Sequence, residues 1–397
     1  MKGRSTNRFT ALPVTMGDAF LLETSCGTVL VDGGNHESSL PGLLAQSGLT
    51  GVDILACTHN DSDHANGVIG FLESACTCKE VWLPDKWANL LPVVLMPLPD
   101  FTERVITEIS ALEPAKAERI VEFLKRGDSD LELDHMPDGD EVATREDGWP
   151  IPALDTLDEA LPWGIQSIQS ADEHHGFGIE FYRWWYHRLD RTDAVIFATA
   201  VEVAARIRRI ALVAYQRGIT VRWFKFAPTS PSGGLPWLKP VNSSEVARVR
   251  FVKATDSVLP PVLLSISNKE SLAFRALLED GNDVLFTADT DLANVVLPAI
   301  TGKSIVTAPH HGSKDNSVAI ERIVGNVEGH ADRLLWVRSD SQNRKRPGPA
   351  YLQLPDETRH CTRCRTPQGA KGQQAVVFDM SGGEWSKTSS TTMCKCQ

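Results

Sequence analysis

The sequence predicts an α/β fold in which two strand-rich segments flank a helical one. Residues 10–80 and 255–336 alternate short apolar runs with turn residues, which indicates strands joined by tight connections. The intervening residues, about 85–215, instead space apolar side chains such as Val105 and Ile109 as an amphipathic helix does. With 397 residues, of which 42% are hydrophobic and 23% charged, the chain is long enough for a substantial buried core.

The first strand-rich segment contains several apolar runs that are bounded by glycine and other turn residues. Its candidate strands are 19–23, 29–32, 52–58 and 81–83. We expect a short helix between the second and third of these runs. A further helix is predicted over 68–73, after the loop that follows the third run.

The second strand-rich segment repeats this pattern after a predicted strand at 219–226. Its candidate strands are 262–267, 271–278, 284–287, 305–308 and 334–337. We therefore expect residues 1–397 to form a single domain. Within that domain, 85–215 would be a mainly helical insertion and 340–397 a basic, cysteine-containing C-terminal extension.

The negative charge of the chain is concentrated in one block. The formal net charge of -11 argues on its own against a protein that coats nucleic acid. However, residues 101–160 contain 17 Asp or Glu and 6 Lys or Arg, so this block accounts for the whole net charge. Basic stretches lie at 183–225 and 338–371, although an ordinary solvated surface explains each of them as well. The net charge therefore does not exclude a nucleic-acid partner.

The sequence favours a cytoplasmic protein without membrane association. The N-terminal residues contain no apolar signal-peptide core, and charged residues interrupt the longest apolar stretch, 194–215. Eight cysteines in a chain of this length are too few for a disulfide scaffold. The chain also has no glycine-rich phosphate loop, which argues against nucleotide-driven work.

Several potential metal ligands follow the predicted strand 52–58 within six residues. They are His59, Asp61, Asp63 and His64. A tight loop at a strand end can turn such side chains toward one point, which is what a two-metal site requires. Without a cation, buried carboxylates and imidazoles this close together would repel or desolvate one another. The spacing therefore predicts a metal site.

Two later strands are predicted to end in residues of the same kind. The run 284–287 leads to Asp289, and the run 305–308 leads to His310-His311-Gly312-Ser313. A single strand-terminal Asp is more often a helix cap, and an isolated His pair more often lies on the surface. The occurrence of all three motifs in this order favours one shared site.

Together with Gly17-Asp18-Ala19 and Asp32-Gly33-Gly34, these motifs resemble the metallo-β-lactamase-fold hydrolases. The most similar group is the soluble hydrolase domain of the ComEC competence proteins, in which an Asn-x-x-Ser motif precedes the later Asp. Here Asn268-Lys269-Glu270-Ser271 stands in that place. The resemblance extends over about 10–80 and 219–340. It implies a four-layer αββα sandwich with a metal site along one edge of the two sheets.

The resemblance also implies a set of metal ligands. These are His59, Asp61, Asp63, His64, Asp289 and His310. The first two would serve one metal, the next two would serve a second metal, Asp289 would bridge both, and His310 would complete the second site.

Two residues are expected to take part in catalysis and three to support the site. Asp63 would orient the attacking hydroxide as well as bind metal, and His311 would contact substrate or relay a proton. The expected supporting residues are Asp32, Asn268 and Ser313.

The expected cofactors are two divalent ions, Zn²⁺ or Mn²⁺, with Mg²⁺ as a further choice. The commoner family signature has His where Asp61 stands, and an additional oxygen ligand favours Mn²⁺ or Mg²⁺ over an all-imidazole zinc site. A further His that the family usually supplies has no clear counterpart in this sequence. His135, His174 and His175 in the insertion are candidates for it.

The leading functional hypothesis is a phosphodiesterase or nuclease that acts on DNA or RNA through a metal-activated water. Basic residues interleaved with aromatics, such as Arg222-Trp223-Phe224-Lys225, would suit a nucleic-acid track, although aromatic runs are also typical of a core. One alternative is a hydrolase of small lactones, esters, amides or cyclic nucleotides. Another is an effector of a defence system. It would be held inactive by a regulatory protein partner or by its own acidic insertion.

Four cysteines lie in pairs close to the C-terminus. The pairs are Cys361-x-x-Cys364 and Cys394-x-Cys396. Together they predict an additional structural zinc site with four thiolates. Free thiols or a redox pair are alternatives, because the spacing of the second pair is unusual for zinc.

Overall fold

The computed structural model divides into two compact units. It describes residues 7–126, 141–153, 189–252, 257–278, 281–328, 333–339, 346–364, 373–389 and 394. Unit 1 comprises Met1–Pro84, Arg222–Val246 and Asn268–Gln397, and unit 2 comprises Asp85–Val221 and Ala247–Ser267. The organisation of the whole chain as a single domain stays a prediction.

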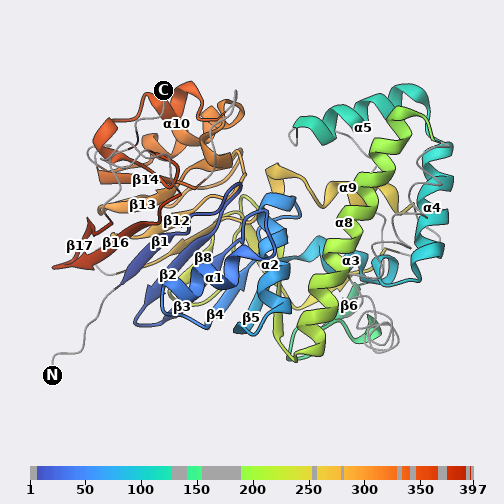
Figure 1. Cartoon of the computed structure of the whole chain (residues 1–397), viewed down its shortest axis with the longest axis horizontal. Helices are drawn as coiled ribbons and strands as arrows, with labels where there is room; N and C mark the ends of the chain where they lie inside the picture. Colours follow the sequence, from blue (N-terminus) through green and yellow to red (C-terminus); the bar gives the residue numbers. More distant parts are fainter. Residues whose placement is uncertain are drawn as a thin grey trace. The chain divides into compact units, whose positions relative to one another are not determined.

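Unit 1 contains a nine-stranded sheet in the order β17-β16-β1-β2-β3-β4-β5-β7-β9 (Figure 1). Its strands are β1 (Arg8–Ala11), β2 (Phe20–Thr24), β3 (Gly27–Val31), β4 (Gly51–Ala56), β5 (Thr77–Pro84), β7 (Thr220–Phe226), β9 (Ser243–Val246), β16 (Val376–Ser381) and β17 (Glu384–Lys387). Strands β3, β4 and β5 are parallel, whereas β1, β2, β16 and β17 pair with their neighbours in the antiparallel sense.

A second sheet of unit 1 has six strands in the order β15-β14-β13-β12-β11-β8. They are β8 (Leu238–Pro240), β11 (Phe274–Ala276), β12 (Val284–Phe286), β13 (Ser304–Thr307), β14 (Leu334–Arg338) and β15 (Arg359–Cys361). Strands β12 to β15 are parallel. Their carboxyl ends therefore lie at the same edge of the sheet, where binding sites of parallel sheets usually form.

The two sheets pack face to face and carry helices on their outer faces. Ile54 and Ala56 of β4 enter a core that also contains Phe286 of β12, whereas Leu55 is buried on the opposite face of β4. Helices α1 (Ser39–Gln46) and α2 (Ser62–Glu73) cover the nine-stranded sheet (Figure 1).

Helices α10 (Ser317–Gly325) and α11 (Pro349–Leu352) cover the six-stranded sheet. Ile320 of α10 and Tyr351 of α11 lie in one hydrophobic cluster with Trp336 of β14. Each of the two sheets thus has a helical layer on its outer side. The predicted αββα sandwich is confirmed.

Unit 2 is mainly helical in its described parts. It contains α3 (Asp85–Val94), α4 (Leu98–Ser110), α5 (Pro114–Arg126), α8 (Arg191–Gln216), α9 (Leu259–Leu264) and a two-stranded sheet of β6 (Glu141–Ala143) and β10 (Arg248–Arg250). Helix α8 packs against α3, α4, α5 and α9. Its start is fixed by Asp190, whose carboxylate accepts the backbone N–H groups of Thr192 and Asp193.

Two local predictions from the sequence are wrong. Residues 262–267, expected as a strand, form the second half of helix α9 and the turn after it. Pro260 and Pro261 suit the first turn of a helix, and a short apolar run does not distinguish helix from strand. Trp223, placed by the leading hypothesis in a nucleic-acid track, is 1% exposed and therefore belongs to the core, which was the alternative for such aromatic runs. The alternation of side chains along β7 turns this ring into the interior.

None of the helices in the described part of the chain combines the length and the apolarity that a membrane span requires.

Candidate metal centre

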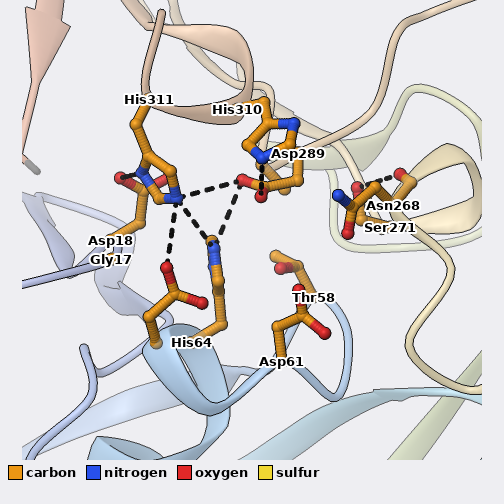
Figure 2. A network of polar contacts seen from close by, with 12 residues as sticks. Gly17, Asp18, Thr58, Asp61, His64, Asn268, Ser271, Asp289, His310 and His311 are labelled. Carbon is orange, nitrogen blue, oxygen red and sulfur yellow. Dashed lines mark hydrogen bonds and ion pairs between the residues drawn. The ribbon is translucent and has the colours of Figure 1, made fainter. Parts of the chain in front are cut away.

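Asp and His side chains from widely separated segments of unit 1 converge at one end of the two sheets (Figure 2). Asp61 is the N-cap of α2, and Asp63 and His64 lie in its first turn. Asp289 follows β12, and His310 lies in the turn after β13. The three motifs predicted from the sequence therefore meet in space.

The backbone around this cluster is strained. Asp32, Ala288, His310 and His311 have φ angles of 59°, 47°, 46° and 56°. Residues with a Cβ rarely adopt the left-handed region, and such outliers persist only where the surrounding structure holds them. The turn with His310 and His311 is thus held in an unfavourable conformation that points both imidazoles at the cluster.

Carboxylates orient two of the imidazoles through Nδ1. Asp32 Oδ2 lies 2.8 Å from His64 Nδ1, and Asp18 Oδ1 lies 3.0 Å from His311 Nδ1. A carboxylate accepts the Nδ1–H proton and leaves the Nε2 lone pair free to bind a metal. Asp32 also accepts hydrogen bonds from the backbone N–H and the hydroxyl of Thr58, so its own position is fixed.

Neutral oxygens orient the other two imidazoles in the same way. Thr58 Oγ1 lies 3.0 Å from His59 Nδ1, and Asn316 Oδ1 lies 3.0 Å from His310 Nδ1. Because the Thr58 hydroxyl donates to Asp32, it can accept the proton of His59 Nδ1. Both histidines therefore direct Nε2 toward the same centre.

One oxygen of Asp289 faces His64 and His311. Asp289 Oδ1 lies 3.2 Å from His64 Nε2 and 3.5 Å from His311 Nε2, and the two Nε2 atoms are 3.3 Å apart (Figure 2). His311 Nε2 is also 3.6 Å from Asp63 Oδ2. Asp63, His64, His311 and one oxygen of Asp289 thus form the first half of the cluster.

The second oxygen of Asp289 faces a different set of side chains. Asp289 Oδ2 lies 3.5 Å from His310 Nε2 and 4.0 Å from His59 Nε2. Asp61 Oδ2 lies 3.8 Å from His59 Nε2. Asp289 thus lies between two sets of side chains, with His311 beside His64, where His310 was expected, and His310 beside the other oxygen. Which of these residues bind metal stays a prediction.

The charges in the cluster depend strongly on one another. Burial alone would lower the pKa of His64 and His311, but neighbouring carboxylates outweigh it and raise the pKa of His64 well above its usual value and that of His311 to about 10. Burial would raise the pKa of Asp289, but the surrounding imidazoles hold it well below its usual value. The carboxylates therefore require positive charge beside them.

The donor set fits divalent metal ions. Asp289 Oδ1 and His59 Nε2 are buried and have no hydrogen-bond partner among the described residues, although each points into the cluster. Ligand atoms of Asp18, His64, Asp289 and His311 all lie within 4.8 Å of one another. Buried polar atoms without partners are costly, and a cation between them would remove that cost.

The three residues expected to support the site take different positions. Asp32 orients His64 and Thr58, as described above. Asn268 is 2% exposed and accepts the hydroxyl of Ser271 through its backbone oxygen, while its side-chain Oδ1 has no described partner. The Ser313 hydroxyl accepts the backbone N–H of Asp315, so it caps the following turn. Their roles in catalysis stay predictions, as do those of the proposed ligands.

Asp18 is a site residue that the sequence analysis left without a role. Besides His311, it accepts a hydrogen bond of 2.7 Å from the Ser339 hydroxyl. Its neighbour Gly17 has φ +83°, and a Cβ there would lie 1.5 Å from the backbone oxygen of Asp63. The Gly17-Asp18 pair was visible as part of the family resemblance, but no signal in the sequence paired it with His311.

Arg346 is a second site residue that no motif indicated. Its Nη2 lies 2.7 Å from His310 Nε2, and its Nη1 lies 3.7 Å from Asp63 Oδ2. The side chain is 18% exposed. It belongs to the basic stretch 338–371, which was predicted only as a general feature. A guanidinium therefore lies directly beside the Asp/His cluster.

The C-terminal cysteines form a separate cluster. Ligand atoms of Cys361, Cys364 and Cys394 lie within 4.8 Å of one another. Cys396 and the histidine candidates in the insertion, His135, His174 and His175, lie outside the described residues.

Comparison with known proteins gives a family match over part of the chain. Residues 12–147, about a third of the chain, match the family model of the metallo-beta-lactamase superfamily. No curated protein matches the sequence significantly. The fold of this superfamily implies divalent metal ions, and the Asp/His cluster is a candidate site for them. The αββα sandwich of the chain is consistent with the metallo-beta-lactamase fold.

Proposed function

We propose that this metal-dependent hydrolase is a phosphodiesterase that cleaves nucleic acid. The observation that supports this most is the position of Arg346, whose guanidinium contacts both His310 and Asp63. A guanidinium presents a planar fork of donors that matches two oxygens of a phosphate. A small neutral lactone or ester offers no comparable charge for it to bind.

The residues that would hold the metals divide around Asp289. His64 and His311 lie beside Asp289 Oδ1, and Asp63 lies beside His311; these residues would form one position. His59 and Asp61 lie toward Asp289 Oδ2 and would form the other. His310 faces the second position but also contacts Arg346. Bound divalent ions would supply an activated water at neutral pH and offset the charge that develops on a phosphoryl group.

The protein's own residues would position the substrate and the water. Arg346 would bind the phosphate oxygens whose bonds to phosphorus stay intact. Its contact with Asp63 would place that phosphate beside the Asp63 carboxylate. The pKa of Asp63 lies far below its usual value, because the charges and hydrogen bond of the nearby imidazoles outweigh its burial. Asp63 would therefore be ionised at neutral pH and able to orient a water through its proton.

A panel of substrates tests this function. The full-length protein is incubated with single-stranded DNA, double-stranded DNA, RNA, a chromogenic lactam and a chromogenic lactone, each with Zn²⁺, Mn²⁺ or Mg²⁺. We expect cleavage of at least one nucleic acid in a metal-dependent manner. Turnover of the lactam or lactone alone would refute the phosphodiesterase and support a small-molecule hydrolase.

The role of Arg346 is tested by Arg346→Met, with Arg333→Met as its matched control. Arg333 is an exposed arginine of unit 1 that donates to the backbone oxygen of Thr301. We expect the Arg346 variant to raise KM for nucleic acid by about tenfold to a hundredfold and to reduce the salt dependence of binding by about one phosphate contact. Equal KM values for the two variants would contradict the assignment.

A further inference from the structure

A second cluster of potential metal ligands lies at the edge of the six-stranded sheet of unit 1. Cys361, Cys364 and Cys394 bring their sulfur atoms within 4.8 Å of one another. Cys361 and Cys394 are each 1% exposed. Cys361 ends the edge strand β15, and Cys364 follows it in a turn. The spacing between these two is the Cys-x-x-Cys spacing common in structural zinc sites.

The third cysteine arrives from a distant part of the chain. The backbone N–H of Cys394 donates to the Arg359 oxygen of β15 at 2.9 Å. Between Cys364 and Cys394 the chain forms β16 and β17, which belong to the nine-stranded sheet. The chain therefore leaves β15 after Cys361 and Cys364, and it returns to the same strand at Cys394.

The sulfur geometry favours a metal over a disulfide. Cys364 Sγ and Cys394 Sγ are 3.6 Å apart, whereas a disulfide bond is about 2.05 Å long. Sulfurs bound to one zinc ion are close neighbours that remain unbonded to each other. In addition, the backbone N–H of Arg363 donates to Cys361 Sγ at 3.3 Å, the kind of outer contact that orients a ligand atom.

We propose that Cys361, Cys364 and Cys394 bind a structural zinc ion as thiolates. Zinc prefers sulfur ligands, and a site built from thiolates selects it over Mn²⁺ or Mg²⁺. The ion fixes Cys394 and the residues around it to β15, which is the edge strand of the six-stranded sheet. This site differs in ligand type from the Asp/His cluster, so the atoms around a bound metal distinguish the two sites.

Arg338 connects the zinc site with the turn that carries His310 and His311. Its Nη1 lies 3.6 Å from Cys361 Sγ, and its Nε donates to the backbone oxygen of His311 at 2.7 Å. The side chain is fully buried. Its positive charge offsets part of the negative charge that three thiolates would bring into the interior. Zinc at the cysteines would therefore also support the strained turn that carries His311.

X-ray absorption at the zinc edge tests the proposal on the full-length protein. The protein is purified from zinc-supplemented cells, as wild type and as the Asp289→Ala variant, which weakens the other site. We expect zinc–sulfur scattering at about 2.3 Å in both proteins. Substitution with Co²⁺ should give a thiolate-to-metal charge-transfer absorption. The number of sulfur scatterers then shows how many cysteines, Cys396 included, are ligands.

Single cysteine variants locate the site. Cys364→Ser should lose the sulfur scattering and one equivalent of zinc, while Cys26→Ser, which removes an exposed thiol in unit 1, should keep both. Zinc with only nitrogen and oxygen neighbours in the wild type would overturn the proposal, even if Cys364→Ser fails to fold. A Cys364–Cys394 disulfide, detected by mass spectrometry of protein purified without reductant, would overturn it as well.

Discussion

The Asp/His cluster and the cysteine cluster of unit 1 are built in different ways. The Asp/His cluster joins residues as distant as Asp18 and His311, which are 293 positions apart, and its backbone is strained at several of them. The cysteine cluster takes two of its three described sulfurs from one strand end and the turn after it. Its ligands are soft thiolates, whereas those of the first cluster are carboxylates and imidazoles.

The comparison separates a reactive site from a supporting one. In the Asp/His cluster, the Asp61 side chain is 34% exposed, so solvent and substrate can reach that side. The sulfurs of Cys361 and Cys394 are enclosed, as is usual where zinc only stabilises a fold. Strain is therefore found where ligand exchange is needed, and regular strand geometry where it is not.

The largest effect should come from removing the shared carboxylate. Asp289→Ala takes a ligand from both halves of the Asp/His cluster, so we expect hydrolysis to fall by at least about a thousandfold, or ~4 kcal/mol of transition-state stabilisation. Steady-state kinetics measures the loss. Asp291→Ala is the matched control, because the Asp291 carboxylate accepts the backbone N–H of Ala293. Comparable activity of Asp289→Ala and the control would disprove a metal site at Asp289.

A chelator should remove metal from the two clusters one after the other. A chelator reaches the partly exposed Asp/His cluster first, so hydrolysis should stop while zinc–sulfur scattering persists. Returning Mn²⁺ or Zn²⁺ should restore activity at that stage. Samples taken over time and analysed for both activity and sulfur-bound zinc give the order. Loss of the sulfur-bound zinc before activity would reverse our assignment of reactive and supporting sites.

An intermediate effect is expected when the partner of His311 is changed. Asp18→Asn keeps the shape but weakens the acceptor for Nδ1–H, so metal affinity should fall by about tenfold to a hundredfold. Isothermal titration with Mn²⁺ measures this affinity. Asp53→Asn is the control, since Asp53 lies in β4, where its carboxylate accepts the Thr28 backbone N–H and pairs with Lys79. If both variants bind Mn²⁺ equally, Asp18 has no influence on the metal.

The smallest effect concerns an ion pair that lies in neither cluster. Burial alone would raise the pKa of Glu245, but the hydrogen bonds and charge of Arg222 together with the Gly234 N–H lower it below 4.5. The pair therefore stabilises the fold above about pH 4.5, and this contribution is lost as the pH falls through the lower pKa of the folded state.

Glu245→Gln should remove this dependence on pH. Because the pair is partly solvated, we expect the free energy of unfolding to fall by less than about 1 kcal/mol near neutral pH. In acid, the free energies of unfolding of variant and wild type should differ by less. Thermal unfolding between pH 3 and pH 7 measures it. A difference that grows as the pH falls would mean that the sign of the pKa shift is wrong.

Local sequence patterns were sufficient to predict most of the core of the fold. The runs that became β3, β4 and β7 combine β-branched residues with a preceding glycine, and these are strong strand signals. The run at 262–267 failed because a short apolar segment fits either a strand or a helix. Its place in unit 2, next to α8, depends on tertiary contacts that no local pattern contains.

The Asp/His cluster was predicted in outline because each of its motifs follows the carboxyl end of a strand, β4 in one sheet and β12 and β13 in the other. The positions of His310 and His311 beside different oxygens of Asp289 were not predicted, since two adjacent histidines differ only in the turn that carries them. Arg346 was hidden for a similar reason: a basic stretch does not reveal which of its arginines points inward. These details depend on backbone conformation and on partners far away in the chain.

Anomalous diffraction from crystals soaked in Mn²⁺ tests the central claim most directly. We predict anomalous peaks in contact with both oxygens of Asp289, one beside His64 and His311 and the other beside His59 and Asp61. The absence of any anomalous density at Asp289 under saturating Mn²⁺, in a protein that hydrolyses its substrate with that ion, would contradict the account.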